Sequence, residues 1–261
     1  VFINTAAPAR VGLGLRFLIP ESPLCLLRRG RTADAEAVLA KVARTNGRAD
    51  VSPDLSRAAR SLGTPGSAGS MFRPDLRRRS ALILAVWLLV SASYYGVFVW
   101  LPVRLAGLGF GFLRGESFLV LVALAQLPGY ALAAYGVERW GRRPTLIAFL
   151  LLSALGCFAF GIGSSVGFLA AATLLMSFAL LGTWGALYAF TPELYPTELR
   201  ATGMGSAGAA ARLGGLLAPS VLAPVIASGF GLALGAFAAL LALAAALTLM
   251  IEVETRRMPL G

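Results

Sequence analysis

The stretch WGALYAFTPELYPTELRATGMG, Trp184 to Gly205, decides the fold class of this chain. The residues that lead into its centre, 167–190, carry no charged side chain, which is typical of a helix that crosses a membrane. Pro192 and Pro196 then favour a turn, because proline lacks an N–H group and disfavours helix in the residue before it. Charges are costly at the centre of a bilayer, so this turn is expected at an aqueous face. Its charged residues are Glu193, Glu198 and Arg200.

The composition of all 261 residues supports a membrane protein. Hydrophobic residues make up 57% of the chain and charged residues 13%, a balance that an ordinary soluble domain does not have. The net charge of +11 could also suggest nucleic-acid binding. In an apolar chain, however, basic residues outside the spans are better explained by the excess of Lys and Arg in cytoplasmic loops. Nucleic acid is therefore not an expected partner.

The polar residue types argue against an enzyme. The chain has no histidine, which excludes Ser-His and Cys-His catalysis, HExxH zinc sites and a histidine proton relay. Cys25 and Cys157 lie far apart without the spacing of metal ligands, and we expect both to be free thiols. No catalytic residue, metal site or cofactor is therefore predicted.

Six segments are long and apolar enough to cross a bilayer, which takes about 20 residues. They are residues 81–102, 117–137, 144–163, 167–190, 203–227 and 229–251. They lack the alternating pattern of barrel strands, and backbone groups in hydrocarbon must bond internally, so we expect helices. The predicted fold class is an all-α membrane protein with a six-helix transmembrane bundle.

Basic residues gather on one side of this predicted bundle. Fourteen of the 23 precede the first span, and others follow the second, fourth and sixth spans. The loops of the opposite side contain only Arg104 and Arg114. This asymmetry predicts that the basic side is cytoplasmic, with both ends of the six-helix unit inside the cell and the protein in the cytoplasmic membrane.

The chain divides into four predicted regions. Residues 1–19 are too short and too charged to span, and we interpret them as the end of a truncated transmembrane helix. Residues 20–80 are expected to form a cytoplasmic loop domain, 81–251 the bundle and 252–261 a cytoplasmic tail. Within the loop domain, residues 63–70 (GTPGSAGS) are typical of a flexible linker.

Two short helices are expected in the loop domain. The first starts at the capping residue Thr32 and stops at Gly47, and the second occupies the region of residues 52–63. The apolar stripe of the first helix consists of Ala35, Val38, Leu39 and Val42. We expect both helices to lie along the cytoplasmic face, and the alternative is a solvated loop with fluctuating helices.

Three motifs resemble those of a known transporter family. PESP (20–23) is similar to the PESPRWL signature, GVERWGRRP (136–144) to G-x-x-x-D-R-x-G-R-R, and PELYPTELRATG (192–203) to P-E-x-x-P-T-x-x-R-x-x-G. On these residues the chain resembles the second half of a major facilitator superfamily transporter, nearest the sugar, organic-ion and niacin porters. The departures are Leu24, Cys25 and Glu138, which stand where the family has Arg, Trp and Asp.

The resemblance implies a twelve-helix fold, of which this chain would supply the second half, and transport by alternating access. It also implies a cytoplasmic gate, in which acidic and basic side chains pair while the carrier faces outward. The residues that match this gate are Glu138, Arg139, Arg142, Arg143, Glu193 and Arg200. Arginine keeps its charge and can fork onto a carboxylate, which suits such a latch. The alternative is that these charges only hold the loop in water.

Aromatic residues within the spans are candidates for substrate binding. Tyr188 stands five positions before Glu193, where sugar porters have an aromatic residue that lines the site, and Trp184 lies on the same helix face. Tyr94 and Tyr95 match the Tyr-Tyr of a further family pattern, although tyrosines at helix ends can also form interfacial belts. The amides of that pattern, which would bind a sugar, are absent, and this weakens a hexose interpretation.

Two polar residues complete the predicted substrate site. Gln126 lies in the middle of its span, where it either faces the substrate or holds two helices together. Arg212 lies roughly 14 Å into the fifth span at 1.5 Å per residue, where an unpaired charge is expensive. Its partner would be an anionic substrate, carbonyls freed by Pro219 and Pro224, or an acid in the first half of the protein. Snorkelling to the interface is the remaining alternative.

These observations predict a secondary transporter for a small polar organic solute, such as an aromatic or nicotinate-like acid. The expected partners are the lipid bilayer, the substrate and the N-terminal half of the same protein, with a coupling proton left open. The alternatives are a sugar porter of the same superfamily and an inactive truncated membrane fragment. A membrane enzyme or a channel would need intramembrane catalytic groups or a ring of like charges, and the spans contain neither.

Overall fold

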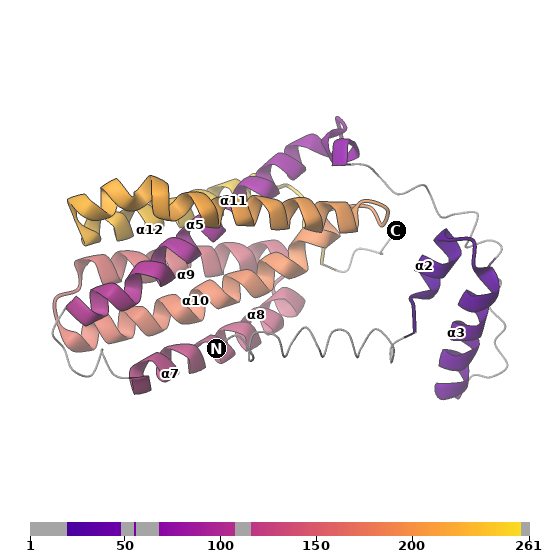
Figure 1. The fold of residues 1–261 in the computed structure, drawn as a ribbon, viewed down its shortest axis with the longest axis horizontal. Coiled ribbons are helices and arrows are strands. Elements are labelled where there is room, and N and C mark those ends of the chain that lie inside the picture. Colours follow the sequence, from indigo (N-terminus) through magenta and orange to yellow (C-terminus); the bar gives the residue numbers. More distant parts are fainter. Residues whose placement is uncertain (1–19, 48–54, 56–67, 108–115, 257–261) are drawn as a thin grey trace. The chain divides into compact units, whose positions relative to one another are not determined.

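The computed structural model describes residues 20–47, 55, 68–107 and 116–256, and every regular element in these ranges is a helix (Figure 1). The chain divides into two compact units, Val1–Thr64 and Pro65–Gly261. The helix predicted for residues 1–19 lies outside the described residues, as does the first part of the predicted linker. The last part of that linker belongs to a 3₁₀ helix, so the flexible stretch predicted from the sequence is too long.

The first unit contains two described helices that pack on each other, α2 (Pro23–Arg28) and α3 (Thr32–Thr45). Their contacts form a small apolar cluster of Leu26, Leu27, Ala35 and Leu55, with Val38 and Leu39 packed against it. Apart from Leu55, the second predicted loop helix lies outside the described residues. The short helix α2 was not expected from the sequence. Its first residue is a proline, whose fixed φ suits the first turn of a helix.

The start of α3 differs from the prediction. Thr32 is its first helical residue rather than its cap, because Arg31 occupies the cap position, and no side chain caps the helix. Arg31 Nε instead donates to Asp34 Oδ2 at 2.7 Å across the first turn. The predicted apolar stripe ends in solvent at Val42, which is 48% exposed. Gly47 follows the helix with φ of +69°, a conformation that favours glycine after a helix.

The second unit is a bundle of long helices that lie side by side (Figure 1). Its elements are η1 (Ala68–Phe72), α5 (Arg77–Gly107), α7 (Glu116–Leu124), α8 (Gln126–Arg139), α9 (Arg142–Ile162), α10 (Val166–Glu193), α11 (Arg200–Ser228) and α12 (Phe230–Leu249). Five described stretches are long and apolar enough to cross a membrane: Arg77–Val99, Ser117–Arg139, Arg142–Ile162, Val166–Glu193 and Gly231–Leu249. α11 corresponds to the predicted span 203–227 and is not among the five, although its 29 residues suffice in length.

Each long helix of the bundle packs on particular neighbours. α5 packs on α11 and α12, α10 packs on α8 and α9, and α12 packs on α9. The largest side chains buried between them include Trp87, Phe118, Phe190 and Phe237. Several buried polar side chains find partners inside the bundle: Trp87 Nε1 donates to Thr191 Oγ1 at 2.8 Å, and Ser177 Oγ donates to the carbonyl of Val122 at 2.9 Å.

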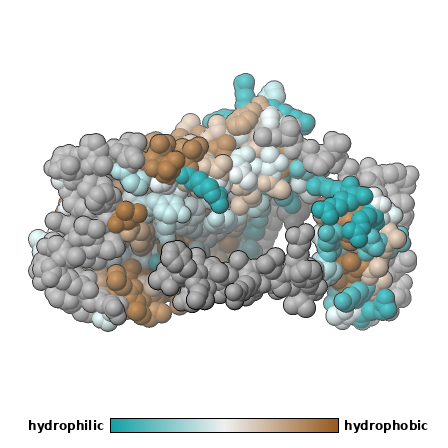
Figure 2. Space-filling view, in the orientation of Figure 1, coloured by the Kyte–Doolittle hydropathy of each residue, from teal (hydrophilic) through white to brown (hydrophobic). Residues whose placement is uncertain are grey.

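The outer surface of the bundle is rich in exposed apolar side chains, and brown hydrophobic patches lie over it in Figure 2. Leu216, Leu127 and Ile162 are 72%, 64% and 64% exposed. Apolar surface of this extent marks contact with lipid or with another protein. Together with the five long apolar helices, this surface indicates a bundle that lies in a membrane.

One glycine sets how closely α11 approaches α5. A Cβ atom on Gly214 would lie 2.4 Å from the carbonyl oxygen of Leu88, whereas one on Gly205 of the same helix would meet nothing within 4 Å. Gly214→Ala should therefore force the two helices apart and lower the melting temperature of the detergent-purified protein. Gly205→Ala is the matched control, and it should leave the melting temperature unchanged or raise it, because alanine favours helix by about 0.5–1 kcal/mol. Equal melting temperatures for the two variants would contradict this close packing.

Candidate functional site

The turn between α8 and α9 begins the first of two candidate sites, which we name the charged end. Gly141 has φ of +115°, a conformation that L side chains rarely adopt, and it lets the chain reverse directly into α9. A Cβ atom at this position would lie 2.9 Å from the carboxylate of Glu254. The residues of the charged end are Glu138, Arg142, Arg143, Glu193, Glu254 and Thr255.

Arg142 is the centre of the charged end. Its Nε donates to Glu193 Oε2 at 3.0 Å and its Nη2 to Glu193 Oε1 at 3.2 Å, so the guanidinium forks onto the carboxylate. Nη1 donates to the carbonyl of Val137 at 2.9 Å, and Nη2 lies 3.3 Å from Glu138 Oε1. The side chains of Arg142 and Glu193 are only 15% and 22% exposed, which shields this pair from water. The pair ties the start of α9 to the end of α10.

The tail after α12 closes the same network. Glu254 accepts hydrogen bonds from the backbone N–H groups of Arg142 at 2.9 Å and Arg143 at 3.0 Å. These N–H groups belong to the first turn of α9, which has no carbonyl partners for them within the helix. Thr255 Oγ1 donates to Glu193 Oε2, and the Arg143 guanidinium donates to the carbonyls of Thr248 and Leu249. Three helices are thus joined by one set of polar contacts.

The predicted gate residues do not all meet in this network. Arg139 instead lies over the ring of Tyr135, 5.8 Å from its centroid, and Arg200 Nε donates to the carbonyl of Tyr195 at 3.2 Å. Burial raises the pKa of the Tyr195 phenol above its ordinary value. Glu254 and Thr255 were not predicted from the sequence, because no local signal indicates that the tail folds back onto the start of α9. The role of all these residues as a gate stays a prediction.

Removing the charge of Arg142 should destabilise the bundle. Arg142→Gln leaves the carboxylate of Glu193 half buried without its cation, and we expect a loss of about 2–4 kcal/mol, slightly below the cost of breaking a fully buried pair. Arg139→Gln is the matched control with the same change of charge, two residues before the turn's glycine, and should change little. Urea or thermal unfolding of both variants in detergent measures the difference. Similar losses for both would show that the fork onto Glu193 contributes no special stability.

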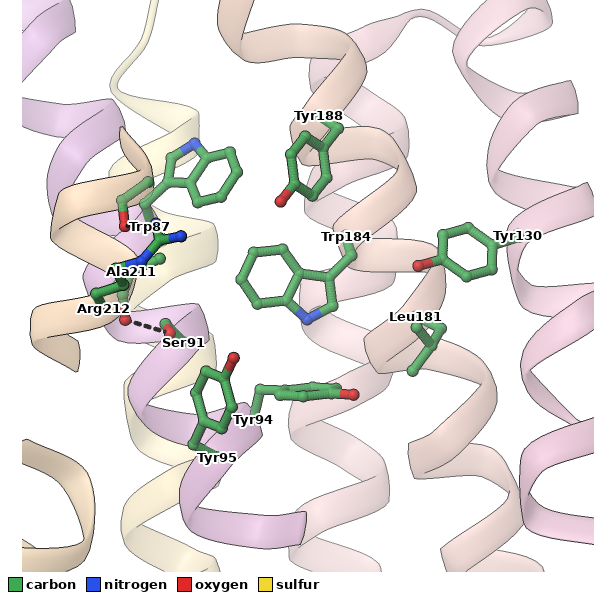
Figure 3. A pocket seen from close by; sticks show the side chains of 11 residues that line it. Trp87, Ser91, Tyr94, Tyr95, Tyr130, Leu181, Trp184, Tyr188, Ala211 and Arg212 are labelled. Atoms are coloured by element: carbon green, nitrogen blue, oxygen red, sulfur yellow. Dashed lines mark hydrogen bonds between the residues drawn. The ribbon is translucent and has the colours of Figure 1, made fainter. Parts of the chain in front are cut away.

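The second candidate site, the aromatic cavity, has a volume of about 350 Å³. It lies among α5, α8, α10 and α11 (Figure 3). Its lining consists of Trp87, Ser91, Tyr94, Tyr95, Tyr130, Leu181, Trp184, Tyr188, Gly208, Ala211 and Arg212. Six of these eleven residues are aromatic, so the cavity presents ring faces, hydroxyl groups and a single cationic side chain.

The aromatic side chains hold one another in place. The Trp87 ring lies 5.4 Å from that of Trp184 and 5.0 Å from that of Tyr188, both in edge-on arrangements. Tyr94 makes similar edge contacts with Trp184 at 5.8 Å and with Tyr95 at 5.4 Å. Edge-to-face pairs of this kind stabilise each other beyond their buried area. The wall of the cavity is therefore formed by a connected set of rings from α5 and α10.

Arg212 contributes a positive charge to the aromatic cavity. Figure 3 shows its guanidinium on the α11 side of the cavity, near Trp87. Its Nη1 donates to the Gly208 carbonyl at 3.2 Å, one turn earlier in the same helix. None of the eleven lining residues is acidic, and the described residues contain no ion pair to this arginine. Toward the described residues, the guanidinium thus uses only one of its hydrogen-bond donors, to the Gly208 carbonyl.

Five of the six predicted substrate residues line this cavity: Tyr94, Tyr95, Trp184, Tyr188 and Arg212. Gln126 does not, because its Nε2 donates to Ser177 Oγ at 3.2 Å and so connects α8 with α10. This is the inter-helix contact that the sequence left as the alternative for Gln126. Whether the five bind substrate stays a prediction.

The lining residues that sequence analysis missed are Trp87, Ser91, Tyr130, Leu181, Gly208 and Ala211. Helical spacing could have found some of them. Trp87 and Ser91 lie seven and three residues before Tyr94, and Gly208 lies four before Arg212, so each shares a helix face with a predicted residue. The described residues contain no cluster of three His, Cys, Asp or Glu side chains that could hold a metal ion.

Comparison with known proteins places the chain among transporters. Residues 1–260 match the sequence pattern of the family described as sugar (and other) transporter. A Bacillus subtilis (strain 168) protein provisionally named niacin/nicotinamide transporter NiaP is 38% identical over 182 residues, which cover 69% of this chain and 46% of that protein. The niacin transporter NiaP of Acinetobacter baylyi is 34% identical over 240 residues, 91% of this chain and 54% of that protein.

The fold is similar to that of a solved transporter. The proton:xylose symporter XylE, a major facilitator superfamily protein in a structure with bound 6-bromo-6-deoxy-D-glucose, superposes with a TM-score of 0.74. The identity is 22%, and the match covers 99% of this chain and 57% of XylE. The chain spans about half the length of the curated relatives it matches.

Proposed function

The chain belongs to the sugar (and other) transporter family of the major facilitator superfamily, and we propose that it forms half of a secondary transporter for a small organic anion. In this proposal the aromatic cavity is one wall of the substrate site, and the N-terminal half of the protein supplies the other. The protein works as a carrier by alternating access and not as an enzyme. The observation that carries the proposal is Arg212, a cation that faces an aromatic cavity whose eleven lining residues include no acid.

The charge of Arg212 favours an anion. A guanidinium within a membrane span is expensive unless it is paired or reaches water. Its bond to the Gly208 carbonyl satisfies one donor, whereas a ligand carboxylate can accept two in a fork. A bound acidic substrate therefore supplies the missing counter-charge, and this counter-charge is lost again when the substrate is released.

The rings of the cavity favour a flat, partly apolar ligand. Trp87, Trp184 and Tyr188 present faces and edges on which an aromatic ring packs well. The two bacterial relatives carry names that refer to niacin, an aromatic acid, and this agrees with the chemistry of the cavity. We therefore propose a nicotinate-like aromatic acid as the substrate class. A sugar is the second candidate, since the tyrosine hydroxyls could bind one, but the cavity lacks a carboxamide.

The proposal includes an orientation. The charged end is cytoplasmic, because the basic residues of the chain gather on that side, and the membrane is the cytoplasmic membrane. The fork of Arg142 on Glu193 then acts as a gate that holds α9 to α10 in one state and parts in another. The alternative role, a purely structural clasp, predicts no change in transport when the pair is weakened. A coupling proton is compatible with this scheme but has no assigned residue.

Uptake of radiolabelled nicotinate into proteoliposomes with the full-length protein tests the role of Arg212. Arg212→Gln should lower nicotinate uptake about 10- to 100-fold, because a hydrogen bond to a charged group contributes about 1.5–3 kcal/mol. Nicotinamide, which has the same ring without the carboxylate, is the matched control. Its ability to compete with nicotinate for the protein should change much less in Arg212→Gln than nicotinate uptake does. Arg212→Lys should keep part of the activity, since the charge remains but the fork is lost.

Two results would contradict the proposal. One is unchanged nicotinate uptake by Arg212→Gln. The other is glucose uptake by the wild-type protein in the absence of any nicotinate uptake, which would favour the sugar candidate.

A further inference from the structure

A buried donor in the aromatic cavity has no hydrogen-bond partner. Trp184 is only 9% exposed, and its Nε1 bonds to no acceptor in the part of the chain that the structure describes. The neighbouring tryptophan shows the contrast, because Trp87 Nε1 donates to Thr191 Oγ1 at 2.8 Å. Buried indole N–H groups normally find a partner, so this one is available to an acceptor from outside the chain.

The position of the ring explains why the chain itself offers none. In Figure 3 the nitrogen-bearing edge of Trp184 points to the side of Tyr94, away from Tyr188. The Tyr94 ring stands at 85° to the indole with centroids 5.8 Å apart, and an aromatic face is at best a weak acceptor. Trp87 and Tyr188 contact the rest of the indole, so the donor edge is held against the Tyr94 ring and is buried beneath it.

The donor lies on a different wall from the cation. Trp184 projects from α10, whereas Arg212 projects from α11 on the other side of the view in Figure 3. A ligand that fills the cavity can therefore meet the guanidinium at one end and, when the Tyr94 ring turns aside, the indole N–H at another. Only a ligand with two separate acceptors satisfies both groups.

We propose that Trp184 determines specificity by donating its indole N–H to a second acceptor of the ligand, a ring heteroatom separate from the carboxylate. This assignment rests on the proposed function, since it takes the carboxylate to bind Arg212. The ligand class is a heteroaromatic acid with a pyridine-type nitrogen in the ring plane. A carbocyclic acid of the same size leaves the indole donor unpaired and binds more weakly.

Nicotinate and benzoate are matched probes, because they share shape and charge and differ at the ring nitrogen. The measurement is the dissociation constant of each acid for the detergent-purified full-length protein, by calorimetry or scintillation proximity. The wild-type protein should prefer nicotinate about 10-fold. Trp184→Phe keeps a ring but removes the N–H, and it should abolish this preference while benzoate affinity changes less than about threefold.

Trp87→Phe is the control variant. It also removes an indole N–H, but one that bonds to Thr191, so the ratio of nicotinate to benzoate affinity should stay at its wild-type value. A ratio that falls equally in both variants would overturn the assignment of Trp184.

Should Trp184→Phe fail to fold, the affinities of the wild-type protein for the two acids still test the assignment. Equal wild-type affinities for the two acids overturn the assignment and leave the anion proposal standing. Binding of neither acid overturns the proposed function and this inference with it.

Discussion

A hydrocarbon layer does not solvate charge, and this constraint accounts for where the charged side chains of the bundle lie. Arg142, Glu193 and Glu254 meet at one end of the helices, where each satisfies the others and the first turn of α9. Arg212 is the exception, because it lies within a helix and faces the aromatic cavity instead of a carboxylate. Such a residue is tolerated within a membrane where a cavity, a backbone carbonyl or a counter-charge compensates its charge.

The two candidate sites are linked by α10. This helix contributes Trp184 and Tyr188 to the aromatic cavity and ends at Glu193 in the charged end. A rigid helix that contacts both sites gives a physical route by which a change at the charged end could alter the cavity. In our proposal, parting of the Arg142 fork frees the end of α10 as the carrier changes state. Trp184 and Tyr188 would then move with α10, relative to the rings that α5 contributes.

Much of the fold could be predicted from the sequence, because long uncharged stretches without an alternating pattern form helices in a membrane. The turn after Glu193 and the basic turn before α9 were also readable, since their charges and prolines are local signals. The contact of Glu254 with α9 was not, because nothing in the tail indicates where it returns. Tyr130 was missed for a related reason: α8 is apolar on several faces, so the pattern does not fix which face meets the cavity. For Gln126, the sequence left two roles open, and packing of α8 on α10 decides where its amide lies.

The central claim is that position 212 faces a water-filled site that an aromatic acid occupies. Arg212→Cys, in full-length protein with Cys25 replaced by serine, can be treated in membranes with a water-soluble thiol reagent, and Leu155→Cys on the exposed face of α9 serves as the control. The account predicts that Cys at 212 reacts and that bound ligand analogues slow the reaction, while Cys at 155 stays unreactive in lipid. An unreactive Cys at 212, or equal reactivity at the two positions, would contradict it.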